Sequence, residues 1–416
     1  MNSDKSLKKC AFCDSFNTDL IMDFGTMALA GGFLKKNNFD KEPKFRMRMA
    51  FCNDCYAVQI IDGIPPDLMF KDYFYFSSNI KTLKNHFKEY ANEITKRFID
   101  DKNSSVLEFG CNDGILLKPL ANLGIKTLIG VDPAKNVIET INDKRIKTIC
   151  DYFNEEVSKN VVENYGKINV VMANNAYAHI DKIQETTRAV KNVLSKDGVF
   201  VFEVHKLGVV IDELQYDMIY HEHIYYYSLL SVINHFKRYS MKVFDIKEIS
   251  IHGGSYRFYV CNDNGKFSNE ISKEVQKVID LEKRKGYDKF DTFMDFSNNV
   301  QKVKEDLMNL LKKLKLDGKN IAGYGASGRA NTMLQYCEID NNLVDYMIDD
   351  SKAKQGYYTP GSHLEIKSNE SLYDNPPDYV IVFAWTFFDE IKNKNQEYIN
   401  NGGKFIIPLP KVSIYP

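Results

Sequence analysis

The feature that most constrains the fold is an alternation of short apolar segments with amphipathic segments in the middle of the chain. Five segments have the length and the Val, Ile, Leu and Phe content of buried strands, namely 105–109, 127–132, 147–151, 168–173 and 198–203. Strands that alternate with helices pair in parallel, and the helices then cover both faces of the sheet. The sequence therefore predicts an α/β fold built on a doubly wound parallel sheet.

The chain is too long for this sheet to be its only domain, because single cores seldom grow past roughly 250–300 residues and the chain has 416. We predict three domains, over residues 1–75, 76–265 and 266–416. The second begins with a helix at 80–100. The third begins with a charged helical connector and continues from residue 320 as a Rossmann-like α/β unit, with buried strands at 344–350 and 379–385.

Four of the eight cysteines form two Cys-x-x-Cys pairs, Cys10 with Cys13 and Cys52 with Cys55. Each short turn places two thiolates on one side of a tetrahedral ion, so the two pairs together indicate zinc. Four sulfur ligands leave no open coordination position, and we therefore expect a structural ion rather than a catalytic one. A redox pair or unrelated cysteines are the alternatives.

The turn after the first strand of such a sheet is where a nucleotide binds. Here it contains Glu108, Gly110, Asn112 and Gly114. Its spacing differs from the Gly-x-Gly-x-x-Gly of dinucleotide enzymes, in which a pyrophosphate lies on the helix N-terminus. The acid at the end of the strand would repel a phosphate but suits a cationic or amine-bearing ligand.

Polar residues follow the later strands at the same edge of the predicted sheet. Asp132 ends the second strand, 22 residues after Gly110, where its carboxylate can bind ribose hydroxyls. Asp151 and the nearby Phe153 follow the third strand and are placed to meet the amino group and ring of an adenine. Asn174 follows the fourth strand. This ordered set predicts S-adenosylmethionine as the cofactor.

The densest group of titratable side chains contains Tyr220, Glu222 and His223. His179 follows the fourth strand, at the edge where the cofactor is expected. One alternative is a second metal site, because a His-x-His pair such as His221 and His223 can bind a cation. The other is an aromatic surface packed against a neighbouring domain.

At this point the sequence resembles the sugar C-methyltransferases that act on nucleotide-linked keto-deoxysugars. The resemblance covers essentially the whole chain and is carried, in the family's order, by the two cysteine pairs and by segments 108–114, 173–179, 220–223, 253–257, 323–327 and 354–361. Six or seven motifs in order are far more specific than any one of them. The resemblance implies a zinc-binding N-terminal domain over 1–75, a class I Rossmann-like methyltransferase domain that binds S-adenosylmethionine over 76–265, and a C-terminal Rossmann-like α/β domain over 266–416 that helps to hold the sugar nucleotide.

The resemblance also implies site residues. The sugar is expected to be surrounded by Tyr75, His179, Tyr220, Glu222 and His223, with Arg257 as a further substrate-binding residue. Methylation of carbon requires an enolate, which needs a base of near-neutral pKa and a donor for the developing oxyanion. We expect His223 to be the base and one of its neighbours to stabilise or reprotonate the enolate, although Tyr220 and His179 remain candidates for the base.

The glycine-rich turn of the C-terminal unit contains Ser327 and Arg329, which we expect to bind the nucleotide phosphates, because a guanidinium can pair with phosphate bidentately. The family more often has Lys-Gly-Asn near this position, so the identity of the nucleotide stays open. A dehydrogenase-like cofactor site and simple close packing at Gly323 and Gly325 are the alternatives.

Charge and hydropathy exclude other classes of protein. The 55 basic and 56 acidic residues almost cancel, which argues against a nucleic-acid binder. No apolar run approaches the roughly 18 residues of a membrane span, so we expect a cytoplasmic protein without membrane contact. An O- or N-methyltransferase on a sugar nucleotide, a zinc-ribbon RNA methyltransferase and a non-catalytic sugar-nucleotide binder remain alternatives. The oligomeric state is not predicted.

Overall fold

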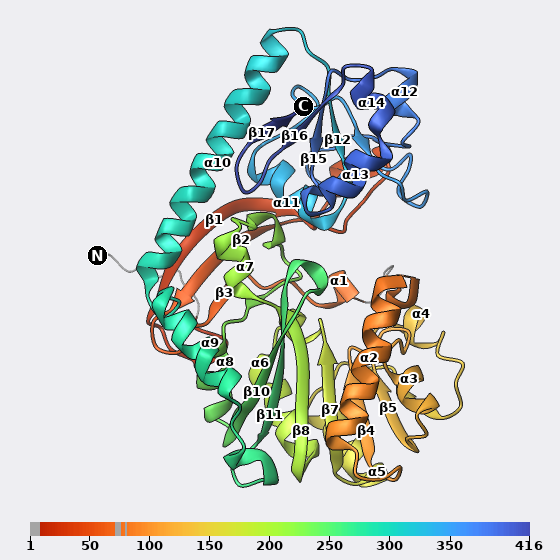
Figure 1. Cartoon of the computed structure of the whole chain (residues 1–416), viewed down its shortest axis with the longest axis vertical. Coiled ribbons are helices and arrows are strands. Elements are labelled where there is room, and N and C mark those ends of the chain that lie inside the picture. Colours follow the sequence, from red (N-terminus) through yellow and green to blue (C-terminus); the bar gives the residue numbers. More distant parts are fainter. Residues whose placement is uncertain (1–8, 71–75, 80) are drawn as a thin grey trace.

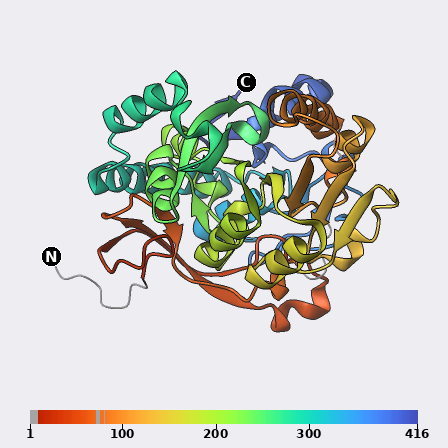
Figure 2. The same cartoon turned by 90° about the horizontal axis from the view of Figure 1, so that it is seen from below.

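The computed structural model describes residues 9–70, 76–79 and 81–416. Its described strands form three sheets, and Figure 1 shows the C-terminal sheet above, the central sheet below and the N-terminal strands between them. In the view from below, the N-terminal strands run along the lower side of the molecule (Figure 2). The expected tyrosine of the site, Tyr75, lies outside the described residues.

The N-terminal sheet is antiparallel and takes one strand from far along the chain. Its strands are β1 (Thr18–Ala28), β2 (Lys44–Cys52), β3 (Val58–Ile60) and β9 (Tyr225–Tyr226), in that order. Because β9 follows the segment of Tyr220 and His223 directly, the N-terminal sheet anchors that segment.

The central sheet has the order β6-β5-β4-β7-β8-β11-β10. Its strands are β4 (Ser105–Phe109), β5 (Thr127–Val131), β6 (Ile146–Ile149), β7 (Ile168–Asn174), β8 (Leu194–His205), β10 (Met241–Ile249) and β11 (Ser255–Asn262). The first five are parallel and confirm the five predicted strands. The antiparallel pair β10 and β11, which the sequence reading did not predict, extends the sheet past β8.

Helices cover both faces of the central sheet. One face packs against α2 (Lys81–Phe98), α3 (Leu117–Asn122) and α4 (Lys135–Ile138). The other packs against α5 (Glu155–Tyr165), α6 (Ile183–Val193), α8 (Leu229–Lys237) and α9 (Lys273–Arg284). Two short helices, α1 (Asp67–Phe70) and α7 (Leu207–Asp212), lie in connections. The doubly wound architecture is thereby confirmed, and α2 matches the helix predicted at 80–100.

The C-terminal sheet has the order β14-β13-β12-β15-β16-β17, in which only β17 is antiparallel. Its strands are β12 (Ile321–Tyr324), β13 (Met347–Ile348), β14 (Ile366–Lys367), β15 (Tyr379–Val382), β16 (Lys404–Ile407) and β17 (Ser413–Tyr415). The helices are α11 (Gly328–Tyr336), α12 (Ser371–Asp374), α13 (Phe388–Lys394) and α14 (Gln396–Asn400). This strand order is that of a Rossmann fold, with the reversal between β12 and β15.

The long helix α10 (Phe290–Leu316) connects the two larger sheets along one side of the molecule (Figure 1). Its apolar residues from Phe293 to Leu314 are buried on one face, in a core shared with the N-terminal and C-terminal sheets. The predicted solvated connector is therefore amphipathic, as expected, but one face of it belongs to the core.

Candidate functional site

The turn between β4 and α3 has backbone angles that side chains seldom adopt. Gly110 and Gly114 have φ of +65° and +75°, and Asn112 has φ of +50°. A Cβ atom at Gly110 would lie 2.3 Å from the Cβ of Ala176, so only glycine fits there. The glycine at position 110 of this turn is therefore required by the close approach of Ala176.

Asp132, at the end of β5, holds this turn in place. Its Oδ2 accepts a hydrogen bond from the Asn112 amide at 2.9 Å, and its Oδ1 accepts one from the Ala134 amide at 2.9 Å. Burial raises the pKa of Asp132, while the two amides oppose that effect. The expected contact of Asp132 with ribose remains a prediction.

Glu108 is a buried carboxyl group beneath the turn. Its Oε1 accepts a hydrogen bond from Asn174 Nδ2 at 2.8 Å. Burial raises the pKa of Glu108 to about 8, and the nearby carboxylates of Asp132, Glu203 and Asp113 raise it further, against the effect of Asn174. An isolated buried carboxylate is costly, so the group is largely protonated near neutral pH when nothing cationic lies beside it.

The donors and acceptors around this turn fit S-adenosylmethionine. Among the described residues, Glu108 Oε2, Asp113 Oδ1 and Asn174 Oδ1 are buried oxygens without a hydrogen-bond donor. Buried acceptors are normally satisfied, so three of them at one turn leave places for a ligand that brings N–H groups and positive charge. The ammonium group of the cofactor has both.

The edge beyond β6 differs in part from the expectation. Asp151 is exposed there and accepts a hydrogen bond from the amide of Tyr152 at 2.7 Å. Phe153 instead packs into the core, with its ring stacked on Phe109 at a centroid distance of 4.7 Å. Contact of Asp151 with an adenine remains a prediction, and the packing of Phe153 in the core does not favour stacking of the adenine on that ring.

Tyr220 and His223 form a hydrogen-bonded pair with a defined tautomer. The His223 Nδ1 atom lies 3.1 Å from the carbonyl oxygen of Met218, and its Nε2 atom lies 2.9 Å from the Tyr220 hydroxyl. A carbonyl can only accept, so Nδ1 carries the proton. In the neutral ring, Nε2 is then the acceptor, and the Tyr220 hydroxyl donates to it.

His179 ends a 3₁₀ turn (Tyr177–His179) after β7, and its ring meets that of His223 edge-on with centroids 5.0 Å apart. Burial lowers the pKa of His179 to about 4, so this ring is neutral at physiological pH. Glu222 lies beside Gly31, where a Cβ would be 3.4 Å from its Oε1. Loss of hydration raises the pKa of Glu222 to about 7.

The alternative of a His-x-His metal site is not supported. His221 is buried and turns toward the N-terminal sheet, where its Nε2 atom lies 3.3 Å from the carbonyl oxygen of Phe45. His223 faces Tyr220 instead. Within the described ranges, the cysteine cluster is the only group of three or more potential ligands that converges.

The two arginines assigned to the substrate have protein partners. Arg257, on β11, is buried, donates from Nε to Glu203 at 2.7 Å and from Nη1 to Glu93 at 3.0 Å, and lies over the ring of Tyr90. Arg329 binds the carboxylate of Asp217 through two nitrogens. Contact of either arginine with substrate remains a prediction, and these bonds do not favour it.

Ser327 caps α11, because its hydroxyl accepts a hydrogen bond from the Ala330 amide at 3.2 Å. Gly328 lies beside Tyr220, because a Cβ atom at Gly328 would be 4.0 Å from Tyr220 Cζ. The glycine-rich turn of the C-terminal sheet therefore adjoins the Tyr220–His223 pair, as expected for one shared site.

Sequence reasoning missed Asp217 and Trp385. Asp217 is fully buried and receives the Trp385 indole N–H at 2.9 Å as well as the Arg329 guanidinium. The available signal was that Trp385 is the only tryptophan of the chain and follows a buried strand at the ligand-binding edge. Its partner Asp217, 168 residues earlier, lies in the same titratable segment as Tyr220 and His223, but nothing singled it out from its neighbours.

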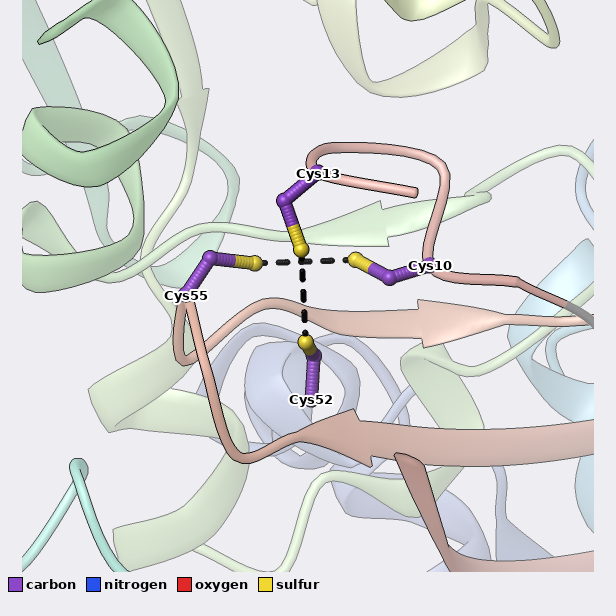
Figure 3. A group of neighbouring side chains, drawn as sticks. All are labelled: Cys10, Cys13, Cys52 and Cys55. Carbon is purple, nitrogen blue, oxygen red and sulfur yellow. Dashed lines mark hydrogen bonds between the residues drawn. The ribbon is translucent and has the colours of Figure 1, made fainter. Parts of the chain in front are cut away.

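The four paired cysteines form a closed metal centre. Their Sγ atoms all lie within 4.8 Å of one another, and Figure 3 shows them pointing at a common centre. Cys10 and Cys55 are 3.5 Å apart, and Cys13 and Cys52 are 3.6 Å apart. Sulfur atoms bound at 2.3 Å to a tetrahedral zinc ion would be about 3.8 Å apart, so the cluster fits zinc and leaves no position for water.

Known families match three consecutive parts of the chain. A zinc binding domain model matches residues 10–70, a methyltransferase domain model matches 83–244, and a C-methyltransferase C-terminal domain model matches 250–410. The C-methyltransferase NovU of Streptomyces niveus is 29% identical over 408 residues, which cover 98% of this chain and 96% of that protein.

Two further similarities each cover less than half of the chain. The ubiquinone biosynthesis O-methyltransferase of Pelagibacter ubique is 27% identical over 108 residues, 25% of this chain and 44% of that enzyme. A solved S-adenosylmethionine-dependent methyltransferase from Anabaena variabilis is 14% identical, with a TM-score of 0.34, and the match covers 43% of this chain and 95% of that one.

In the described part of the chain, no helix combines the length and apolar character needed to cross a membrane.

Proposed function

We propose that this S-adenosylmethionine-dependent C-methyltransferase with a zinc-binding N-terminal domain methylates a carbon next to the ketone of a nucleotide-linked keto-deoxysugar. The substrate class rests on the motifs that resemble sugar C-methyltransferases. The observation that carries the chemistry is the Tyr220–His223 pair, in which the Met218 carbonyl places a proton on Nδ1 and Nε2 lies 2.9 Å from the Tyr220 hydroxyl, so that Nε2 of a neutral ring accepts from the phenol.

In this proposal His223 is the final acceptor of the proton that leaves the sugar carbon. The C–H bond breaks, the proton reaches Nε2 directly or through the Tyr220 hydroxyl, and the electron pair moves onto the ketone oxygen. An imidazole of near-neutral pKa suits this role. S-Adenosylmethionine, when bound, supplies the methyl group that the enolate carbon attacks.

His179 and Glu222 have the properties needed for the enolate. Because the pKa of His179 is lowered to about 4, its ring is neutral and can donate a hydrogen bond to the oxyanion without being an acid. Because the pKa of Glu222 is raised to about 7, this side chain can hold or release a proton near neutrality. Tyr75, from the resemblance, stays a candidate for the same site.

The test follows deuterium at the carbon beside the ketone, with dTDP-4-keto-6-deoxyglucose as the first probe. Wild-type protein should exchange the label with solvent even when a cofactor analogue without a transferable methyl group is bound. His223→Gln should lose exchange and methylation by about 10²–10⁴-fold, the usual contribution of a positioned base. The matched control is His221→Gln, because His221 faces the N-terminal sheet.

Two outcomes would contradict the proposal. Full exchange in His223→Gln would transfer the role of base to Tyr220 or His179. A methyl group found on oxygen or nitrogen of the product, with no exchange at carbon, would replace enolate chemistry by O- or N-methylation.

A further inference from the structure

Asp217 is a fully buried carboxylate three residues before Tyr220, and all its partners come from the C-terminal unit. Its Oδ2 accepts from Arg329 Nε at 2.9 Å and from Trp385 Nε1 at 2.9 Å, and its Oδ1 accepts from Arg329 Nη2 at 3.1 Å. Arg329 lies in the first turn of α11, after β12, and Trp385 follows β15. The two donors therefore come from either side of the point where the strand order reverses.

Helix α11 holds the same short segment at further points. The Thr332 hydroxyl donates to the carbonyl oxygen of Ile219 at 3.1 Å, and the Tyr216 hydroxyl lies 3.3 Å from Cys337 Sγ. The residues on both sides of Met218 are thus fixed to the C-terminal unit. The backbone of Met218 has little freedom to move without breaking one of these bonds.

Met218 contributes the carbonyl group that orients His223. Its oxygen accepts from His223 Nδ1 at 3.1 Å, which fixes the proton on Nδ1 and leaves Nε2 as the acceptor toward Tyr220. The same oxygen also accepts from the Tyr226 hydroxyl at 3.4 Å. A shift of this carbonyl would let the ring turn or would move the proton to Nε2.

We propose that Asp217 is a positioning residue through which Arg329 and Trp385 of the C-terminal unit fix the tautomer of His223. The link runs from the guanidinium and indole to the Asp217 carboxylate, along the backbone through the next residue to the Met218 carbonyl, and from there to Nδ1. An effect of Asp217 on the reaction rate rests on the proposed role of His223 as base. The position of the proton on the His223 ring can be measured whether or not His223 is the base. In this proposal the C-terminal unit fixes the proton position of the proposed base, His223, in addition to lying next to the substrate.

Packing alone gives a weaker account of these contacts. A buried carboxylate is costly unless it is fully hydrogen-bonded, and apolar residues of similar volume often pack at least as stably. Here three charge-assisted bonds converge on one side chain from two elements, an arrangement that fixes geometry more than it adds stability. Two of the three guanidinium nitrogens of Arg329 also donate to Asp217, which leaves fewer N–H donors for a phosphate.

The test is nitrogen NMR of the zinc-loaded full-length chain with isotope-labelled histidine rings, which distinguishes a protonated Nδ1 from a protonated Nε2. The His223 signals are identified by their loss in His223→Gln. Wild type should show the proton on Nδ1 without any substrate present. Asp217→Asn and the milder Trp385→Phe, which keeps an aromatic ring, should move His223 toward the other tautomer.

The matched control is Asp345→Asn, because Asp345 also binds a cation and an amide in the C-terminal unit, Lys315 Nζ at 2.9 Å and the Ile321 amide at 3.0 Å, at the opposite edge of the sheet. It should leave the His223 signals unchanged. With dTDP-4-keto-6-deoxyglucose as probe, Trp385→Phe and Arg329→Lys should lower kcat about 10- to 100-fold, as for other outer partners of a functional histidine, and change KM little.

Three results would overturn the proposal. The first is a proton on Nε2 in the wild type. The second is an unchanged tautomer in folded Asp217→Asn or, where that variant does not fold, in Trp385→Phe. The third is an Arg329→Lys variant that raises KM for the sugar nucleotide and leaves kcat and the tautomer as they were, since this would assign Arg329 to the phosphate.

Discussion

Glu108 should make cofactor binding depend on pH in a way that follows from its surroundings. Burial, with Asp132, Glu203 and Asp113 nearby, raises its pKa to about 8 in the free protein, so at pH 7 most molecules carry a neutral carboxyl group. A cationic ammonium beside Oε2 requires the ionised form. Binding must therefore release this proton, and affinity should rise as the pH rises toward 8.

The size of the effect can be worked out from that pKa. The ionised fraction of Glu108 is about one half at pH 8, about 10% at pH 7 and about 1% at pH 6. The cofactor's amine has an ordinary pKa of about 7.7–8.0, so about half of it has lost its proton at pH 8. The affinity should therefore fall roughly 20-fold from pH 8 to pH 6, and the rise should end near pH 8.

Glu108→Gln should weaken binding at pH 8 by about 1.5–3 kcal/mol, the value of a hydrogen bond to a charged group, and should remove the rise in affinity between pH 6 and 8. Calorimetric titration with S-adenosylhomocysteine, in buffers of different ionisation enthalpy, measures both affinity and proton release. Asp143→Asn is the control, because Arg145 lowers the pKa of half-buried Asp143 to about 2 and this carboxylate stays ionised throughout. A flat affinity in wild type, or the same slope in Glu108→Gln, would refute the reasoning.

Three further predictions concern the zinc site, Asp132 beside the turn after β4, and Glu222. Metal analysis of protein purified without chelator should find about one zinc per chain, and Cys52→Ser should lose it and unfold at lower temperature, because ligand loss couples to unfolding; a metal-free chain of unchanged stability would exclude a structural ion. Asp132→Ala should weaken cofactor binding by about 1.5–3 kcal/mol, measured by the same titration, and unchanged affinity would remove Asp132 from the site. If Glu222 acts in its protonated form, activity should fall as the pH rises through about 7. Glu222→Gln should no longer show this fall in activity at high pH. A fall that persists in the variant would have to come from the titration of another group.

The sequence predicted what depends on local pattern. Apolar runs flanked by turns gave the five parallel strands, and glycines at the end of the first run gave a turn whose positive φ values have a visible cause at Gly110. The cysteine spacing gave the metal centre, because short turns bring thiolates together whatever the rest of the fold does.

What could not be predicted depends on contacts between distant segments. The alternation of polar and apolar residues did not reveal that Phe153 packs on Phe109 rather than facing a ligand. The glycine-rich turn indicated a phosphate partner for Arg329, but its partner in the structure is a carboxylate from another part of the chain, 112 residues away. A short strand such as β13, with two residues, is defined by its neighbours more than by its own composition.

The strand β9 has a consequence for how the molecule is made and for how it can be divided. The metal ligands are complete once Cys55 has been synthesised, but β3 has an open edge until Tyr225 and Tyr226 leave the ribosome and pair with it. Until then the nascent chain presents unpaired backbone groups of the kind that recruit foreign strands. An isolated N-terminal fragment would keep that edge permanently. Exchanging this domain between related enzymes would therefore require the exchange of β9 with it, together with the preceding segment that contains Tyr220 and His223.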